Sequence, residues 1–286
     1  EAWVDKAFDY YETAEPFDKV ENIKNHQYDY VVIALADMAR ANQVREDLIN
    51  LGIDQDKIIW SRFYQVNAGM FPEDRVSYLK NWRFYIKLID TYMGAESVFG
   101  LSGWYQGSPQ LGITGGRDNG ERIARYRVWD YLTKDSVCLD IGCNCGFFDL
   151  ELSRLVKQVV GIDVEKTYIE VANEVRDFKN INNVSFITGN FMDLEENKYE
   201  AVFSLGVHLY ILESGITKED YVAKLIALLK SGGFLFFESH GMETYADQFM
   251  ELSSMLVECG MKIVHRGHSM RDSNRNVTVF CKGKGA

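Results

Sequence analysis

The second half of this chain alternates short apolar runs with longer helical patterns, and this alternation constrains the fold more than any other feature. Between residues 119 and 282 the apolar runs have the length of strands, and helical patterns separate most of them. Strands separated by helices form a parallel sheet with helices on both faces. We therefore predict an α/β fold built on a Rossmann-like, doubly wound, mostly parallel seven-stranded sheet.

The predicted elements follow one another with short connections. We expect strands at residues 136–140, 158–163, 184–188, 200–205, 233–238, 261–267 and 275–282, and helices from 119 to about 132 and at 146–156, 166–179, 218–230 and 244–259. The last two strands have no helix between them, so we expect them to pair antiparallel at one end of the sheet.

The N-terminal region contains a smaller α/β pattern. The apolar run 28–36 predicts a buried strand, the stretch 37–51 predicts a helix, and residues 57–60 predict a second strand. Residues 2–5 form a further candidate strand. Residues 1–62 therefore read as a partial Rossmann-like α/β module, in which the first strand and its glycine turn are missing.

Two further expectations concern this N-terminal module. The chain starts with Glu1 instead of Met, so we expect that it begins inside a domain. Residues 28–60 resemble a nucleotide-binding-like module found beside sugar-modifying enzymes. The roles that stay open for the module are formation of a homodimer, presentation of substrate, and packing.

Residues 63–118 are predicted to connect the module to the second half. Apolar residues at helical spacing predict one long helix from Pro72 to Met93. The segment from Gly94 to Gly120 holds eight glycines, which favour a loop, and we expect this loop to act as a lid that carries Trp104 and Tyr105. The predicted regions are 1–62, the connector and lid at 63–118, and the main domain at 119–286.

Charge and composition narrow the partners. The net charge is −11, which disfavours binding to nucleic acid or to anionic membranes through bulk charge. No apolar run approaches the length needed to cross a bilayer, and the first residues do not resemble a signal peptide. Five unevenly placed cysteines do not make a disulfide framework. We expect a cytoplasmic protein without membrane insertion.

The segment most typical of a binding site follows the strand predicted at 136–140. Its pattern is an acid, Asp140, followed by Gly142, Asn144 and Gly146 at every second position. In an open parallel sheet, ligands bind at the carboxyl ends of the strands, and the first such turn is the usual place. The leading acid would repel a pyrophosphate, so the turn differs from the dinucleotide fingerprint and suits a cationic ligand.

From these residues onward the chain resembles the class I S-adenosylmethionine-dependent methyltransferases, over about residues 120–282. The resemblance implies S-adenosylmethionine as cofactor, with Asp140 holding its ammonium group and Asp163, at the end of the next strand, accepting hydrogen bonds from its ribose hydroxyls. Asn190 and Phe191 follow the third strand and would flank the adenine, and Leu205 ends the strand that floors the transfer site. Gly142, Asn144 and Gly146 would let the turn approach the ligand.

A narrower resemblance concerns the predicted lid. The motif at 140–148, together with Trp104, Tyr105 and Gln106, resembles a subgroup that includes the tRNA wobble-uridine carboxymethyltransferase. A Trp-Tyr element lies upstream of the first motif in that subgroup, so Trp104 and Tyr105 are candidates to cover the cofactor or to pack within the lid.

Catalytic candidates lie beyond two further strand ends. His208 could act as a general base for a hydroxyl acceptor, and Tyr210, Glu238 and His240 occupy comparable positions. Each of them could instead be structural. The Cys143–Cys145 pair has no partners nearby in the sequence that would complete a zinc site, so we predict no metal.

The sequence leaves the acceptor open. We expect an enzyme that methylates a small-molecule or glycan-linked acceptor. The alternatives are a tRNA-modifying methyl or carboxymethyltransferase, a non-catalytic scaffold that binds the cofactor, and a hydride-transferring Rossmann enzyme, which the glycine order at 140–146 disfavours.

Overall fold

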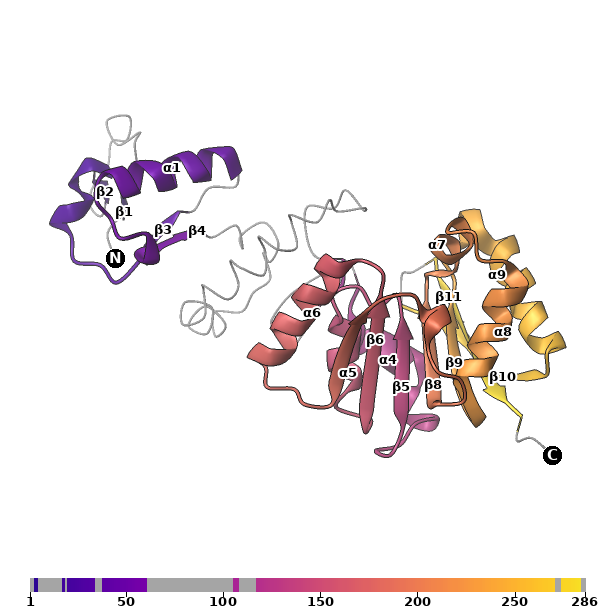
Figure 1. Cartoon of the computed structure of the whole chain (residues 1–286). Helices are drawn as coiled ribbons and strands as arrows, with labels where there is room; N and C mark the ends of the chain where they lie inside the picture. The colour runs from indigo at the N-terminus through magenta and orange to yellow at the C-terminus, as the bar shows by residue number, and fades with distance from the viewer. Residues whose placement is uncertain are drawn as a thin grey trace. The chain divides into compact units, whose positions relative to one another are not determined.

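The computed structural model describes residues 3–4, 17–18, 20–33, 38–60, 105–107, 117–270 and 274–283 (Figure 1). The chain divides into two compact units, Glu1–Ile86 and Lys87–Ala286, which are described separately here. The predicted helix 72–93 and most of the predicted lid, including Trp104, lie outside the described residues.

The N-terminal unit contains the predicted β-α-β arrangement. Strand β3 pairs in parallel with β4, and helix α1 connects them. The bounds are β1 Trp3–Val4, β2 Phe17–Asp18, the 3-10 helix Val20–Asn25, β3 Val31–Ile33, α1 Met38–Asn50, the 3-10 helix Gln55–Lys57 and β4 Ile58–Trp60. Strand β1 pairs in parallel with β2. The strand expected from residue 28 begins only at Val31, because the chain bends at Asp29.

The second unit is built on a seven-stranded sheet in the order β10-β11-β9-β8-β5-β6-β7, which confirms the predicted fold. The strands are β5 Val137–Ile141, β6 Gln158–Asp163, β7 Val184–Thr188, β8 Tyr199–Leu205, β9 Leu229–Glu238, β10 Met261–His268 and β11 Asn276–Lys282. Strand β11 pairs antiparallel with both β9 and β10, whereas the other pairings are parallel. Strands β6 and β7 lie on one side of β5, and β8, the next strand in the chain, lies on the other side of β5. The switch in strand order therefore falls between β5 and β8.

The helices of this unit are α4 Asn119–Tyr126, α5 Phe147–Leu152, α6 Lys166–Phe178, α7 His208–Glu213, α8 Lys218–Leu228 and α9 Met242–Glu258, with 3-10 helices at Val128–Asp130 and Phe191–Asp193. The helix predicted to reach residue 132 ends at Tyr126, because Arg127 adopts φ 53° and closes the last turn with its backbone N–H on Ala124 and Ile123. The short α7 was not predicted from the sequence.

Side chains alternate between the two faces of the sheet, and the two faces carry different helices. On β9, Phe236 stacks on Phe203 at 4.5 Å and contacts Tyr126 of α4, whereas its neighbour Phe237 stacks on Phe249 of α9 at 5.1 Å. Successive strand residues point to opposite faces, so one face packs against α4 and the other against α9. Figure 1 shows α8 and α9 together over β9 and β10.

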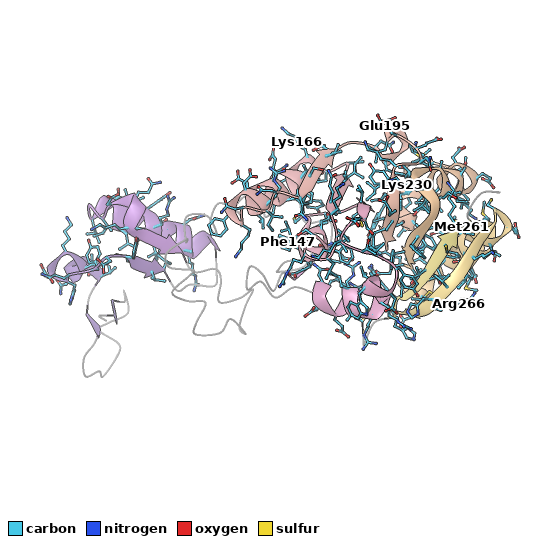
Figure 2. All side chains as sticks on the ribbon, turned by 90° about the horizontal axis from the view of Figure 1, so that it is seen from below. Phe147, Lys166, Glu195, Lys230, Met261 and Arg266 are labelled. Carbon is cyan, nitrogen blue, oxygen red and sulfur yellow. The ribbon has the colours of Figure 1, made fainter. Side chains whose placement is uncertain are left out.

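The surface of this unit is charged and its interior is apolar. Lys166 and Glu195 lie at its periphery, whereas the side chain of Phe147 is fully buried (Figure 2). No helix within the described ranges combines the length and the apolar character needed to cross a membrane.

Candidate functional site

The turn after β5 has the unusual backbone that its sequence predicts. Gly142, Asn144 and Gly146 have φ values of 71°, 52° and 68°, all in the left-handed region. Glycine adopts this region freely and asparagine tolerates it better than most residues, so the asparagine maintains the turn. The backbone N–H of Gly142 donates to Ile162 O at 2.8 Å, which ties the turn to the end of β6.

The glycines of this turn are needed for packing within the protein. A Cβ on Gly142 would lie 2.5 Å from Val207 Cγ1, and a Cβ on Gly146 would lie 2.3 Å from the ring of Phe186. Gly142 also lines the cavity described next, but Gly146 does not. Gly146 thus packs closely against Phe186, and its expected approach to a ligand stays a prediction.

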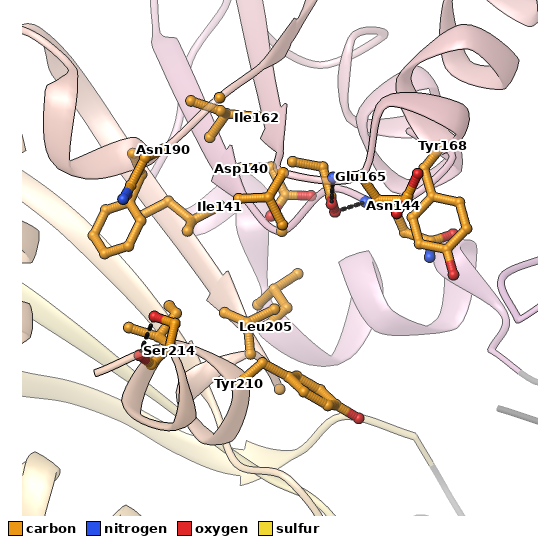
Figure 3. A pocket seen from close by; sticks show the side chains of 18 of the residues that line it. Asp140, Ile141, Asn144, Ile162, Glu165, Tyr168, Asn190, Leu205, Tyr210 and Ser214 are labelled. Atoms are coloured by element: carbon orange, nitrogen blue, oxygen red, sulfur yellow. Dashed lines mark hydrogen bonds between the residues drawn. The ribbon is translucent and has the colours of Figure 1, made fainter. Parts of the chain in front are cut away.

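A cavity of about 410 Å³ lies at the carboxyl ends of β5, β6 and β8, next to the switch in strand order (Figure 3). Asn190 and Tyr168 lie on opposite sides of it, with Asp140 between them. The cavity is lined by these predicted cofactor residues: Tyr105, Asp140, Gly142, Asn144, Asp163, Asn190, Phe191 and Leu205. The turn and the strand ends thus bring together residues that are up to 100 positions apart in the chain.

Asp140 is a buried acid that lines the cavity. Its side chain is 2% exposed, and its Oδ1 accepts no hydrogen bond. Burial raises the pKa of this carboxyl from 3.8 to about 7, although the nearby Arg122 guanidinium opposes the rise. A carboxylate oxygen that is buried without a donor is costly, so the position favours a cationic or hydrogen-bond-donating ligand.

Asp163 is the last residue of β6, and its carboxylate binds the backbone of the turn that follows β5. Its Oδ2 accepts from the backbone N–H of Asn144 at 2.9 Å, and its Oδ1 accepts from Glu165 N at 2.9 Å. Burial raises the pKa of Asp163, and these backbone bonds oppose the rise. Each carboxylate oxygen can accept a second hydrogen bond, so the group can serve the turn and a ligand hydroxyl together.

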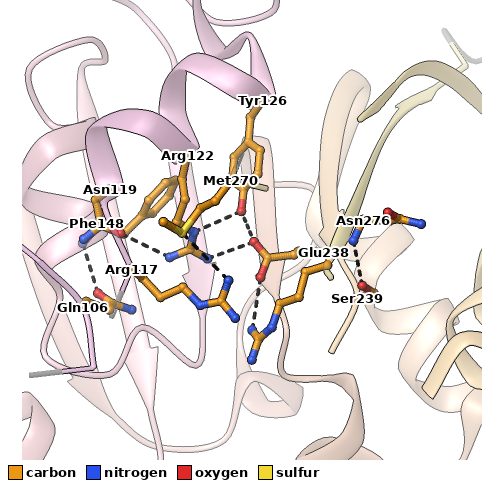
Figure 4. A network of polar contacts seen from close by, with 11 residues as sticks. Gln106, Arg117, Asn119, Arg122, Tyr126, Phe148, Glu238, Ser239, Met270 and Asn276 are labelled. Atoms are coloured by element: carbon orange, nitrogen blue, oxygen red, sulfur yellow. Dashed lines mark hydrogen bonds and ion pairs between the residues drawn. The ribbon is translucent and has the colours of Figure 1, made fainter. Parts of the chain in front are cut away.

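Glu238 does not line the cavity. It is fully buried at the end of β9 between Arg122 and Arg275, whose guanidinium nitrogens each lie 3.2 Å from one of its oxygens (Figure 4). The hydroxyl of Tyr126 also donates to Glu238. Burial alone would raise the pKa of Glu238, but the two guanidinium groups and the hydroxyl outweigh it and hold the pKa below its usual range. Glu238 is a counter-ion to two buried guanidinium groups, and its catalytic role stays a prediction that this geometry does not favour.

His208 also lies away from the cavity lining, at the first turn of α7. Its Nδ1 is 2.6 Å from Gln248 Oε1, and its Nε2 accepts from the backbone N–H of His240 at 2.9 Å. Burial lowers the pKa of His208. Burial together with Arg275 lowers the pKa of His240 to about 4. Both ring nitrogens of His208 are engaged, so its catalytic role stays a prediction that this geometry does not favour.

Tyr210 is the one predicted catalytic residue that lines the cavity. It is 39% exposed and its ring contacts that of His240 edge-on, with ring centroids 5.8 Å apart. Burial raises the pKa of Tyr210, so its hydroxyl is protonated near neutral pH. It can donate a hydrogen bond to a ligand at the rim of the cavity.

Three further residues line the cavity although the sequence analysis did not identify them: Arg122, Glu165 and Tyr168. Arg122 is 3% exposed, and its guanidinium contacts Asn119 Oδ1 at 3.2 Å and Tyr126 OH at 3.1 Å. The sequence of α4, in which Arg122 has polar and charged neighbours, offers no signal that would have identified this residue. Gln106, from the predicted lid, also lines the cavity and accepts from Phe148 N at 3.3 Å.

Metal ligands do not cluster in the part of the chain that the structure describes. No group of three His, Cys, Asp or Glu side chains there is arranged to hold an ion. Cys143 and Cys145 are buried free thiols in the turn, and burial raises the pKa of both.

Comparison with known proteins places this geometry in a family. A family model described as a methyltransferase domain matches residues 132–278, just over half of the chain. A ribosomal protein L11 methyltransferase from Clostridium botulinum (strain Eklund 17B / Type B) is 22% identical over 258 residues, which are 85% of this chain and 77% of that relative. Another, from Clostridium perfringens (strain SM101 / Type A), is 28% identical over 148 residues, but the match spans only 44% of its length.

Among solved structures, the N-methyltransferase NodS from Bradyrhizobium japonicum WM9 in complex with S-adenosyl-L-homocysteine is similar to this chain. The TM-score is 0.47 at 18% identity, and the match covers 57% of this chain and 85% of that one.

Proposed function

The chain belongs to the methyltransferase-domain family and is an S-adenosylmethionine-dependent methyltransferase, and we propose that the cavity beside Asp140 holds this cofactor for transfer to a small-molecule or glycan-linked acceptor. The observation that carries the site assignment is the buried Asp140 carboxyl, which lines the cavity and has no donor on its Oδ1 among the described residues. The Asp140 carboxylate would accept a charge-assisted hydrogen bond from the cofactor's ammonium group. The region 63–118 contributes Tyr105 and Gln106 to this cavity.

The methionine end of the cofactor fits two groups of opposite charge. Asp140 suits the ammonium group, and the Arg122 guanidinium, which also lines the cavity, suits the carboxylate. Gln106 lies at the same wall, where its amide can donate to that carboxylate. Because Asp140 and Arg122 have opposite charges, they would bind the methionine moiety of the cofactor in a single orientation.

The nucleoside end fits the residues that follow β6 and β7. Asp163 is placed to accept from the ribose hydroxyls while it accepts from the backbone of Asn144. Asn190 uses its Oδ1 to cap the 3-10 helix through Met192 N at 3.0 Å, and buried Phe191 offers an apolar wall to the adenine. The direct contact between Asn190 and the base stays a prediction.

Methyl transfer needs alignment more than it needs catalytic groups. When bound, the cofactor supplies an electrophilic methyl group on a sulfonium. Leu205 at the end of β8, together with Tyr210, lines the cavity wall where an acceptor would enter, and Tyr210 can orient the acceptor by donating a hydrogen bond. Apolar walls at this point exclude water, which helps an in-line displacement.

A protein acceptor is the second candidate. It is favoured by the alignments with proteins named ribosomal protein L11 methyltransferases, one of which spans 85% of this chain. A methyl-donor assay separates the two candidates, since transfer to ribosomal protein L11 but to no sugar or small molecule would exclude the first.

The cofactor site is tested by calorimetric titration of the parent chain and of Asp163→Ala with S-adenosylmethionine. We expect the substitution to weaken binding by about 1–3 kcal/mol, the usual cost of losing hydrogen bonds to a buried charged group. Equal affinities for both chains would contradict the ribose assignment. Binding by the parent without transfer to any acceptor would favour a non-catalytic scaffold.

A further inference from the structure

A second carboxyl group lies behind Asp140, and methyl transfer by itself does not account for it. Asp149, in the first turn of α5, is 0% exposed, and neither of its oxygens has a hydrogen-bond donor among the described residues. It does not line the cavity. An ionised carboxylate buried in this way would be very costly, so the group needs either a proton or a partner.

The sheet register places this carboxyl against Asp140. Asp140 of β5 pairs with Gly161 of β6, and residues paired across two strands point to the same face of the sheet. A Cβ on Gly161 would lie 2.6 Å from Asp149 Oδ2, so the carboxyl of Asp149 lies directly over Gly161. The two aspartate side chains are within hydrogen-bond reach of each other.

We propose that Asp149 holds a proton and donates it in a hydrogen bond to Asp140, so that the pair shares one proton and Asp140 presents an anionic oxygen to the cavity. Asp149 is then a positioning residue, which orients the carboxylate that binds a primary ammonium group. The inference rests on the proposed function only in taking that cation to be the cofactor's ammonium.

The charged groups around the pair decide which aspartate keeps the proton. Arg122 from α4 favours the anion at both aspartates, whereas Asp163 from β6 and Glu238 from β9 oppose it at Asp140. Burial raises the pKa of Asp140 to about 7 and raises that of Asp149 well above its ordinary value. The more deeply placed Asp149 therefore retains its proton at neutral pH while Asp140 titrates.

The thiols next to the pair do not compete for this role. Cys143 in the turn and Cys138 on β5 both lie near Asp149 and Asp140, and burial raises the pKa of each thiol. Both thiols are protonated over the range in which Asp140 titrates, so they add no charge to the pair.

Two consequences follow, one of which needs no cofactor. The folded protein holds protons that the unfolded chain releases above about pH 4, so the pair's contribution to stability is lost as pH rises from about 4 through 7 and beyond. At pH 6 most molecules hold a proton on both aspartates, and a cation that binds Asp140 must release one of these protons to solvent.

The test compares Asp149→Asn, which keeps a donor, with Asp149→Ala, which removes it. The exposed Asp247 on α9 provides the matched control, Asp247→Asn. Titration with S-adenosylmethionine at pH 7 should show affinity within about threefold of the parent for Asp149→Asn and Asp247→Asn, and a loss of about tenfold for Asp149→Ala, which leaves Asp140 without its donor. An equal loss in Asp149→Asn and Asp149→Ala would overturn the proposal, because it would show that Asp149 acts as an anion.

The second readout is urea unfolding of the cofactor-free chains from about pH 5 to about pH 9. The parent and Asp247→Asn should lose stability as pH rises, and Asp149→Asn should lose less because it has one fewer buried acid to ionise. Parallel curves for the parent and Asp149→Asn would overturn the shared proton, even if Asp149→Ala fails to fold. Absence of S-adenosylmethionine binding by the parent would contradict the proposed function, and the unfolding curves would still decide the pair.

Discussion

The sheet carries two buried carboxyl groups near its strand ends, Asp140 on β5 and Glu238 on β9, and their pKa values are shifted in opposite directions. Glu238 lies between two guanidinium groups and a hydroxyl, which hold its pKa low, whereas burial raises the pKa of Asp140 to about 7. Both residues follow apolar strands in the sequence, so an acid at a strand end does not by itself indicate a binding site. The partners of the acid distinguish the two cases. An acid that is ion-paired and hydrogen-bonded within the protein stabilises the fold, whereas an acid that lines a cavity can bind a ligand.

The largest effect expected from this comparison is on stability. Glu238→Ala leaves two buried guanidinium groups without their counter-ion, so the free energy of unfolding should fall by about 3–5 kcal/mol, as measured by urea unfolding. The control is Glu251→Ala, which removes an ion pair to Lys218 on the surface and should cost less than about 1 kcal/mol. Similar losses in the two variants would show that the Glu238 network contributes no more than a surface pair.

Asp140→Ala should show the reverse pattern. It leaves the buried Asp149 without its acceptor but removes no guanidinium partner, so the free energy of unfolding should fall by about 1–3 kcal/mol, less than in Glu238→Ala. Affinity for S-adenosylmethionine should fall about 10- to 100-fold, because a charged hydrogen bond to the ammonium group is lost. A variant that unfolds easily and yet binds normally would reverse the roles given to Asp140 and Glu238.

The smallest effect is expected at His208. Since both of its ring nitrogens are bonded within the protein, His208→Asn should change kcat by less than about threefold and leave the pH profile of transfer unaltered. A fall of about 100-fold, together with loss of the limb of the profile near its pKa, would show that this residue acts as a general base after all.

Local pattern was sufficient for much of the main unit. Strands β6 and β7 begin and end where the alternation predicts, and the left-handed Asn144 follows from asparagine's tolerance of that backbone. The carboxyl ends of parallel strands meet at one edge, so the order of strands was enough to bring Asp140 and Asp163 to one cavity.

The remaining features depend on contacts between distant segments, which local pattern does not encode. Arg122 lines the cavity because α4 packs across the sheet against Phe148 and Glu238, residues 26 and 116 positions away. His208 and Glu238 are catalytic candidates because they lie at strand ends. Their partners, Gln248 and Arg275, are distant in the sequence and could be identified only in three dimensions. Gly146 serves Phe186 for the same reason.

The central claim is that Asp140 is the anionic anchor of the cofactor, and calorimetric titration with S-adenosylmethionine at pH 6 and pH 7 tests it most directly. This range lies below the pKa of an ordinary α-amino group, so the ligand stays cationic. With an Asp140 pKa of about 7, ionisation rises from about a tenth to about half, and affinity should increase about fivefold between the two pH values. Asp140→Ala should bind weakly and equally at both pH values. An affinity of the parent that does not change with pH, or an Asp140→Ala variant that binds like the parent, would contradict the account.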